Sequence, residues 1–313
     1  MKVVTGWVSF KDKTIADLFA GTGIVSHFFR TKGSVTIAND AEIYSSTIAH
    51  ALSISTYTPN CKELISKLNL EISEERHADT IGFVTTHYSP RECERMFFTV
   101  ENAQRIDYIR SRLASENLSV DDQKFMMASL LLSADAVSNV PAVYGCYLKS
   151  FKNKAQKEMI LEPVHEMTEV GNGTVTNCDV LSTKWIADAV YLDPPYNNRQ
   201  YSKNYFPLNV IAMPPDQTVT LTGKTGIPDG CFLSEFCQKN AASAFERLFQ
   251  TINAKYIFMS YSSEGIVSKA EMLNILKKYG TVVLYKRPYK RFKSFEYNDG
   301  NVVTEYLFCL TRE

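Results

Sequence analysis

Short apolar segments rich in β-branched residues alternate along this chain with segments in which apolar residues recur every three or four positions. The strand-like segments are residues 13–19, 34–39, 174–178, 189–193, 255–261, 281–285 and 302–310, and helix-like segments follow at 25–29, 234–251 and 268–279. Such alternation predicts a mainly parallel sheet with helices on both faces and ligands beyond the carboxyl ends of its strands. The last two strands have no helical pattern between them, so we expect them to pair antiparallel. The pattern therefore predicts an α/β fold with a mixed seven-stranded sheet.

The strand–helix alternation is interrupted between about Glu75 and His165, where only helical spacing is found. The clearest helices are predicted at 102–117 and 121–140, with Asn102 and Asp121 as candidate N-caps. We therefore predict one α/β domain formed by residues 1–75 and 166–313, interrupted by a helical insertion at 76–165.

Charge changes this picture only locally, because 34 basic and 34 acidic side chains give the 313 residues a formal net charge of zero. Nucleic-acid binding would then depend on clusters of Lys and Arg. One cluster lies at 149–157, where Lys149 and Lys152 stand close to Tyr147 and Phe151. Basic and aromatic side chains in this arrangement suit phosphate contact and base stacking, and a solvated helix face is the alternative.

Several classes of site and location are disfavoured by the remaining composition. The seven cysteines include no CxxC pair, and no histidine stands at metal-ligand spacing, which favours free thiols and no bound metal. The five histidines accompany no nucleophile turn, so we interpret them as structural or surface residues. The first residues show no basic-then-apolar leader, and no apolar run approaches the roughly 18 residues that span a bilayer. We therefore expect a cytoplasmic protein with no membrane partner.

The first predicted strand leads into Asp17-Leu-Phe19-Ala-Gly21-Thr-Gly23, and an apolar helix start follows. Glycines here let the backbone approach a ligand closely, while the helix N-terminus offers free N–H groups. A dinucleotide fingerprint would require a third glycine where Ser26 stands, which argues against that alternative. We interpret Asp17, Phe19, Gly21 and Gly23 as cofactor-binding residues.

Two more acidic residues follow predicted strands at the same sheet edge. Asp40 ends the second strand at the place where doubly wound folds hold ribose hydroxyls. Asp179 follows the third strand, where it could accept a hydrogen bond from an adenine amino group. Either residue alone could be a loop cap, but both together behind one glycine turn favour a nucleoside pocket.

The most specific motif is Asp193-Pro194-Pro195-Tyr196, directly after a strand. Successive prolines fix φ and remove two N–H donors, which holds this corner extended and rigid. The Asp193 carboxylate and the Pro194 carbonyl could together accept both hydrogens of an exocyclic amine, and Tyr196 could stack on its ring. These groups suit direct in-line transfer of a sulfonium methyl group to that amine, with catalysis by orientation and electrostatics. A base inside a duplex would have to be flipped out to reach them.

Together these motifs resemble the D12 class of bacterial DNA adenine-N6 methyltransferases of restriction-modification systems. The similar segments extend over nearly the whole chain: Asp17–Gly23, Phe98–Ala103, Val143–Lys149, Asp193–Tyr201 with Asn204-Tyr205, Gly223–Gly226, Met259–Gly265 and Tyr289–Ser294.

The resemblance implies a Rossmann-like methyltransferase fold that depends on S-adenosylmethionine and acts on N6 of adenine in double-stranded DNA. It implies that Asp40 and Asp193 touch the cofactor and that the insertion 76–165 takes part in target recognition. It also implies a cognate restriction endonuclease in the same system.

Members of this class usually begin with a Tyr/Phe-x-Gly-x-Lys segment that closes over the methionine end of the cofactor. Here Gly6-Trp7-Val8-Ser9-Phe10-Lys11 stands before the first strand and differs from that motif. Trp7 or Phe10 could fill this place, a partner could complete the pocket, or the product could be truncated or begin differently.

Two basic and aromatic segments suit DNA contact. Arg199, Tyr201 and Tyr205 follow the tetrad, where a loop could clamp a flipped nucleotide. Residues 285–293 place five cations beside three aromatic rings, and their candidate phosphate ligands are Lys290, Arg291 and Lys293. An ordinary charged loop is the alternative for the second segment.

Two other functions fit the same residues. The tetrad chemistry would also permit methylation of an amine in RNA or protein. A cofactor-poor DNA-binding or specificity subunit would explain the different N-terminal segment.

Overall fold

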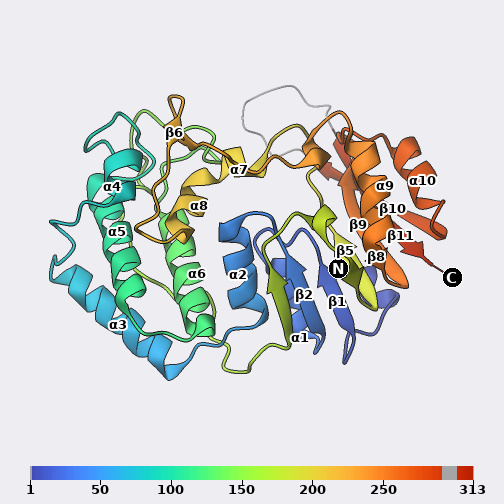
Figure 1. Ribbon diagram of the computed structural model, residues 1–313, viewed down its shortest axis with the longest axis horizontal. Coiled ribbons are helices and arrows are strands. Elements are labelled where there is room, and N and C mark those ends of the chain that lie inside the picture. Colours follow the sequence, from blue (N-terminus) through green and yellow to red (C-terminus); the bar gives the residue numbers. More distant parts are fainter. Residues whose placement is uncertain (1, 291–301, 313) are drawn as a thin grey trace.

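The computed structural model describes residues 2–290 and 302–312, which form an α/β region and a lobe of helices beside it (Figure 1). Within these residues the central sheet has seven strands in the order β10-β11-β9-β5-β1-β2-β3. Their bounds are β1 (Thr14–Asp17), β2 (Val35–Asn39), β3 (Gly173–Thr176), β5 (Ala189–Leu192), β9 (Tyr256–Ser262), β10 (Thr281–Lys290) and β11 (Val302–Thr311). The short strands β4 (Trp185–Ile186) and β8 (Ile252–Asn253) pair with each other, as do β6 (Leu221–Thr222) and β7 (Ile227–Pro228).

The pairing agrees with the topology that the sequence predicts. Strands β3, β2, β1, β5 and β9 are parallel neighbours, and β11 runs antiparallel to both β9 and β10. The predicted α/β fold with a mixed seven-stranded sheet is therefore confirmed. Strand β10 is the main difference in length, because it continues to Lys290 instead of ending near residue 285.

The helices of the described chain are α1 (Ile24–Thr31), α2 (Ile43–Ser53), α3 (Pro59–Ser73), α4 (Phe83–Tyr88), α5 (Val100–Ser115), α6 (Val120–Ala136), α7 (Tyr201–Asn204), α8 (Phe206–Ala212), α9 (Ala241–Thr251) and α10 (Lys269–Leu276). Single 3₁₀ turns lie at η1 (Val4–Gly6), η2 (Val180–Ser182) and η3 (Glu235–Cys237). None of the helices in the described ranges is long and apolar enough to cross a membrane.

Each face of the sheet is buried by a different set of elements, because side chains alternate along the strands. Ala16, Val190 and Ile257 pack on one face with α9 and α10. Ile15 and Ala189 pack on the other face with α1 and the residues before β1.

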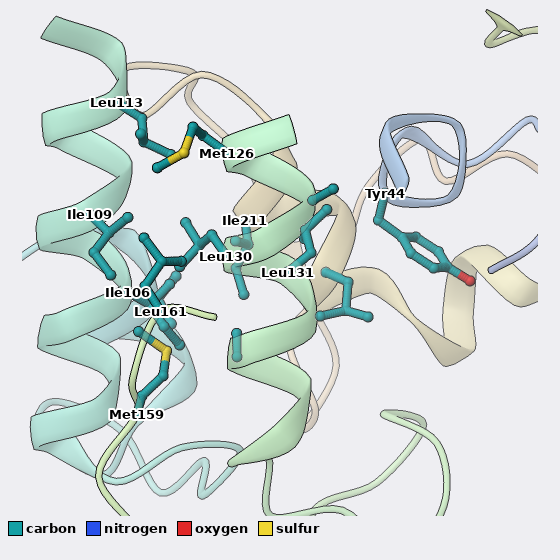
Figure 2. Packing of buried hydrophobic residues seen from close by; sticks show 14 of the residues in the cluster. Tyr44, Ile106, Ile109, Leu113, Met126, Leu130, Leu131, Met159, Leu161 and Ile211 are labelled. Atoms are coloured by element: carbon teal, nitrogen blue, oxygen red, sulfur yellow. The ribbon is translucent and has the colours of Figure 1, made fainter. Parts of the chain in front are cut away.

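The helical lobe has its own hydrophobic core, in which α2, α5, α6 and α8 meet (Figure 2). Ile106 and Ile109 of α5 face Leu130 of α6, and Ile211 brings α8 into the same core (Figure 2). The predicted insertion contributes α4, α5 and α6, whereas α3 precedes residue 76 and α8 follows the tetrad. The lobe is therefore assembled from segments on both sides of the Asp193 corner.

The part of the lobe that precedes the tetrad begins and ends at two adjacent connections. The Tyr57 N–H donates to the Met167 carbonyl at 2.7 Å, and the Gly171 N–H donates to the Ile54 carbonyl at 2.9 Å. These bonds fix the outgoing and returning segments side by side.

The predicted N-caps of α5 and α6 are wrong. Thr99 caps α5 through a bond from Asn102 N at 3.2 Å, and Ser119 caps α6 through a bond from Asp122 N at 3.1 Å. Asn102 is instead buried, and its amide binds the backbone of Ala155, Lys157 and Met159.

The segment after α6 is irregular over residues 137–172, so the predicted helix 121–140 ends early and the basic segment 149–157 is no helix face. Buried amides replace regular backbone pairing here. Asn139 is fully buried, and its Nδ2 donates to the carbonyls of Met96, Leu148 and Ser150. The exposed Lys149 and Lys152 are therefore held on an ordered segment.

Candidate functional site

A pocket lies at the carboxyl edge of the sheet, where β1, β2, β3 and β5 end. The space between its walls, with the solvent at its open mouth included, is roughly 950 Å³. Asp17, Phe19 and Gly21 line it together with Asp40 and Asp179. The structure thus brings together five of the residues that the sequence predicts for cofactor binding.

The two glycines of the turn have different roles. Gly21 and Gly23 have φ values of +52° and +72°, which glycine adopts at little cost. Gly21 lines the pocket, and its N–H donates to Asp40 Oδ2 at 2.8 Å. Gly23 instead packs against α2, where an added Cβ would lie 2.8 Å from the Cα atom of Ala49. Gly23 is therefore required for packing of the turn on α2 and is not among the residues that line the pocket.

Asp17 lies at the end of β1 and is only 1% exposed. Its Oδ2 accepts a hydrogen bond from Ser26 Oγ at 2.7 Å, while its buried Oδ1 has no partner within the described part of the protein. Burial raises the pKa of Asp17 to about 7, and the charges of Asp193 and Asp40 act in the same direction. Ser26, which stands in place of a third glycine, thus orients the carboxyl group that lines the pocket.

Asp40 and Asp179 each organise a loop at the pocket wall. Asp40 Oδ1 accepts from Glu42 N at 2.9 Å, and burial raises the pKa of Asp40 to about 6. Asp179 Oδ1 accepts from Leu181 N at 3.0 Å and caps η2. Because a carboxylate oxygen can accept two bonds, both residues keep acceptor capacity for a ligand.

Two residues of the tetrad, Asp193 and Pro195, line this same pocket. Pro194 is buried, and neither Pro194 nor Tyr196 is among the lining residues. Solvent reaches Asp193 through the mouth, but surrounding protein atoms displace part of its hydration and raise its pKa to about 6. The charge of Glu305 raises this pKa further, whereas a hydrogen bond with Ser260 lowers it. Tyr196 stands edge-on to Tyr261 at 6.4 Å, and its carbonyl accepts from Ile266 N at 2.8 Å.

Comparison with known proteins establishes the family of this chain. Residues 5–275 match the family model of the D12 class N6 adenine-specific DNA methyltransferases. The chain belongs to this family.

Curated relatives support the assignment to this D12 methyltransferase family. The chain is 40% identical to the type II methyltransferase M.CviAII of Paramecium bursaria Chlorella virus 1, over 94% of this chain and 88% of the relative. It is 35% identical to M.NlaIII of Neisseria lactamica, over 97% and 92% of the two chains. It is also 35% identical to M.FokI of Planomicrobium okeanokoites, over 95% of this chain but 48% of that protein. The chain is thus an adenine-specific DNA methyltransferase, and its family and relatives favour this function over an RNA or protein amine methyltransferase and over a cofactor-poor DNA-binding or specificity subunit.

Residues that follow the tetrad in this D12 enzyme also line the pocket. The sequence predicted DNA contact for one of them and no role for the others. Tyr201, 45% exposed, lines the pocket and stacks on Tyr205 with ring centroids 5.8 Å apart. Gln200 and Phe232 also line it, although neither was predicted as a site residue. Phe232 comes from an irregular segment, where no periodic pattern could single it out.

Glu42 was also missed, although it stands two residues after Asp40. It is 7% exposed, lines the pocket and binds the side-chain amide of Asn209. Burial raises the pKa of Glu42 to about 7. Through Asn209, which follows Phe206 in α8, the pocket wall is tied to the helical lobe.

The predicted DNA contacts occupy different places. Arg199 is exposed beside the pocket segment, and the Tyr144 N–H binds the Asn204 carbonyl at 2.7 Å, which attaches the end of the insertion to α7. Lys290 ends β10, while Arg291 and Lys293 lie outside the described residues.

Trp7 and Phe10 do not fill the place of a cofactor lid. Trp7 packs edge-on against Phe258 at 6.3 Å, and Phe10 contacts Phe28 and Phe29 of α1. Neither is among the residues that line the pocket. These side chains instead cover one face of the sheet.

Proposed function

We propose that the methyl donor of this enzyme is S-adenosylmethionine and that the pocket at the carboxyl edge binds it. The unpartnered Oδ1 of Asp17 supports this proposal, because a buried acceptor gains from a ligand that supplies a donor or a positive charge. Asp40 would hold ribose hydroxyls, Asp179 would accept from the adenine amino group, and Phe19 would contact the adenosine through its ring. When bound, the cofactor supplies an electrophilic methyl carbon on a sulfonium centre.

The chain's own residues then prepare the target amine. Asp193, when ionised, accepts one N6 hydrogen, and the Pro194 carbonyl accepts the other. Both bonds orient the nitrogen lone pair for direct in-line attack on the methyl carbon, in which the N–C bond would form as the S–C bond breaks with its electron pair left on sulfur. Asp193, already bonded to one N6 hydrogen, would accept the proton that N6 loses and pass it to solvent. Tyr196 offers its ring to the base, with Pro195 keeping the corner rigid. A target in a duplex must be flipped out of the stack, at a cost of a few kcal/mol that aromatic stacking partly offsets.

The proposed substrate is double-stranded DNA, held by residues from both lobes. Arg199, Tyr201 and Tyr205 follow the tetrad, and Lys149 and Lys152 lie on the ordered segment that ends the helical lobe. Lys290, Arg291 and Lys293 are proposed phosphate contacts. We assign target recognition to the insertion 76–165, and we expect a cognate restriction endonuclease in the same system.

One observation carries the proposal: Asp193 and Pro195 line the same pocket as Asp17 and Gly21. The test is to incubate the protein with tritiated S-adenosylmethionine and unmodified duplex DNA, and to map the modified base by sequencing. We expect N6-methyladenine at one sequence context and loss of transfer in Asp193→Ala.

The matched control is Asp188→Ala, because Asp188 precedes β5 at its opposite end and binds Lys13 and Thr14 there. This control should retain transfer. A fully active Asp193→Ala variant would refute the assigned role.

A further inference from the structure

The chain between β7 and α9 crosses the mouth of the cofactor pocket. We call residues 229–236 the strap. In Figure 1 this part of the chain runs along the top of the view, from the helical lobe toward α9. The strap brings Phe232, Ser234 and Phe236 to the pocket wall. These residues lie far from the glycine turn along the chain, but they line the same pocket as Gly21.

Both ends of the strap are anchored in different hydrophobic cores. Before it, Ile227 packs against the core of the helical lobe, and the Tyr88 hydroxyl donates to the Gly226 carbonyl at 3.2 Å. At its end, Phe236 contacts Phe245 of α9 at 4.9 Å and Phe19 at 5.2 Å. The strap therefore joins the two lobes at the place where the pocket opens.

The middle of the strap is fixed by hydrogen bonds to the segment after the tetrad. Gln200 Nε2 donates to the Ser234 carbonyl at 3.1 Å, and Ser234 N donates to Gln200 Oε1 at 2.8 Å. The Ser202 hydroxyl donates to the Phe232 carbonyl. Three bonds thus hold the backbone at Phe232 and at Ser234, so the backbone that carries the Phe232 ring is fixed before any ligand arrives.

Phe232 and Leu233 differ in a way that points to a ligand. Both are exposed, by 37% and 47%, but only Phe232 lines the pocket. Exposure of an aromatic ring inside a pocket is unfavourable in water and is relieved when an apolar or cationic ligand covers the ring.

We propose that Phe232 is a donor-binding residue, whose ring contacts the bound methyl donor and makes the strap the outer wall of its site. This inference rests on the proposed use of S-adenosylmethionine. Trp7 and Phe10 pack on the sheet face, so neither supplies that wall. Since the strap begins in the helical lobe, donor binding would stiffen the connection between the lobes.

Calorimetric titration of S-adenosylmethionine into the full chain tests this proposal without relying on turnover. For Phe232→Ala we expect the donor Kd to rise on the order of tenfold, as loss of one partly buried ring contact predicts. Phe232→Tyr should restore most of the affinity. Leu233→Ala, one residue away and outside the pocket, should bind as the unchanged protein does.

Phe232→Leu serves as the second variant if Phe232→Ala does not fold, and it should also weaken the donor. The KM for DNA is measured in parallel at saturating donor and should change less than the donor Kd. An unchanged donor Kd in Phe232→Ala or Phe232→Leu overturns the inference, and so does a rise confined to the KM for DNA, which would assign the ring to the target base. If the unchanged protein fails to bind S-adenosylmethionine, the proposed function itself is wrong.

Discussion

At the scale of single residues, the pocket brings together carboxyl groups whose pKa values are raised by desolvation to between about 6 and 7. Asp17, Asp40 and Asp193 line one cavity, and the pKa of each is raised by burial. A carboxyl group that pays a desolvation cost in the free protein gains from a cationic ligand. Ionisation of these carboxyl groups therefore lowers the folding stability of the free enzyme, and the same groups increase its affinity for a positively charged donor.

The acid limb of the rate profile should report the ionisation of Asp193. Only the carboxylate form can accept the N6 hydrogen without donating a proton of its own, so kcat/KM, which reports ionisations of the free enzyme, should fall as the pH drops through about 6. An ordinary Asp would keep activity about two pH units lower. Glu305→Gln removes a neighbouring negative charge and should shift this limb to lower pH. We would measure kcat/KM across this pH range; a limb unmoved by Glu305→Gln would contradict the assignment.

Asp17→Asn should separate stability from donor binding. Because the folded pKa of about 7 lies above the unfolded value, the native state binds more protons and stability falls as pH rises from about 4 to 7. The Asn variant lacks this cost, so at pH 8 we expect it to be more stable by about 1–3 kcal/mol without donor. It should also bind the donor more weakly. Denaturant unfolding and calorimetry measure the two effects, and Ser26→Ala serves as a control that keeps the carboxyl group.

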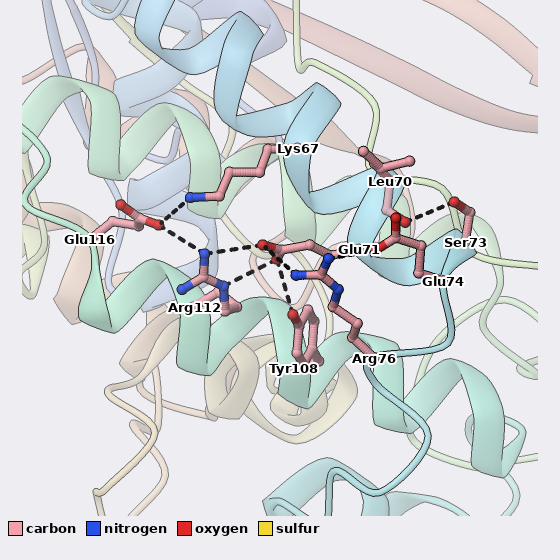
Figure 3. A network of polar contacts seen from close by, with 9 residues as sticks. All are labelled: Lys67, Leu70, Glu71, Ser73, Glu74, Arg76, Tyr108, Arg112 and Glu116. Atoms are coloured by element: carbon pink, nitrogen blue, oxygen red, sulfur yellow. Dashed lines mark hydrogen bonds and ion pairs between the residues drawn. The ribbon is translucent and has the colours of Figure 1, made fainter.

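At the scale of secondary-structure elements, hydrogen bonds and ion pairs between polar side chains fix the position of one helix relative to another, in addition to hydrophobic packing. Figure 3 shows such a network between α3 and α5, centred on Glu71. Arg112 binds Glu71 through Nε at 3.1 Å and Nη2 at 3.3 Å, and the Tyr108 hydroxyl adds a bond at 3.0 Å. Lys67 and Arg112 both pair with Glu116, at 3.6 and 3.2 Å, and extend the network.

Glu71→Ala should destabilise the protein by about 2 kcal/mol, because it leaves Arg112 and Tyr108 without a shared partner. Desolvation acts to raise the pKa of Glu71, but the bonds from Arg112 and Tyr108 outweigh it and lower that pKa. The stabilisation should therefore be present at neutral pH and be lost as the pH falls below the ordinary Glu range. Denaturant midpoints at pH 7 and pH 3 measure both effects. Glu74→Ala, which breaks a more exposed pair with Arg76, should change stability by less than about 1 kcal/mol.

Helices and strands could be predicted where hydrophobic periodicity is strong. They could not be predicted where side-chain hydrogen bonds, instead of regular secondary structure, determine the path of the backbone. All seven predicted strands exist, since alternation and β-branched residues determine them. The caps were placed a few residues late, because Thr99 and Ser119 stand before the first periodic apolar residue. The path of residues 137–172 could not be predicted, because it depends on amide side chains such as Asn139 and Asn102 that reach backbone groups distant in sequence.

At the scale of the whole molecule, the sequence predicted the site's inner wall but not its outer one. Asp17, Gly21 and Asp193 follow strands, and the carboxyl ends of parallel strands meet by necessity. Phe232 reaches the pocket only because α8 packs in the helical lobe and the chain must cross back to α9. No local pattern encodes that return.

The hairpin of β10 and β11 extends past its neighbour and should contact DNA phosphates. Strand β9 ends at Ser262, opposite Glu305, while the hairpin pairing continues to Lys290. Arg287 is level with Ser262, where β9 ends, and Lys286 stands one position earlier, so both exposed residues lie at the base of this extension, at the sheet edge that holds the pocket. If each contacts one phosphate, replacement of either by Ala should reduce the salt slope of DNA binding by roughly 0.9.

Fluorescence anisotropy with duplex DNA at several salt concentrations measures this slope. Lys255→Ala, at the amino end of β9, is the matched control and should leave it unchanged. If Lys286→Ala and Arg287→Ala, like Lys255→Ala, keep the salt slope of the unchanged protein, the hairpin lies outside the DNA interface.

The assembly of the helical lobe from separate segments limits how specificity can be exchanged between related enzymes. The segment between Tyr57 and Met167 begins and ends at adjacent positions, so it could in principle be exchanged as one continuous piece of sequence. Helix α8 breaks that simplicity, since Phe206 and Ile211 fill the same core from beyond the tetrad. A chimera that transplants only the insertion would expose α8 to a foreign surface, so a functional graft must carry both pieces and the strap that follows them.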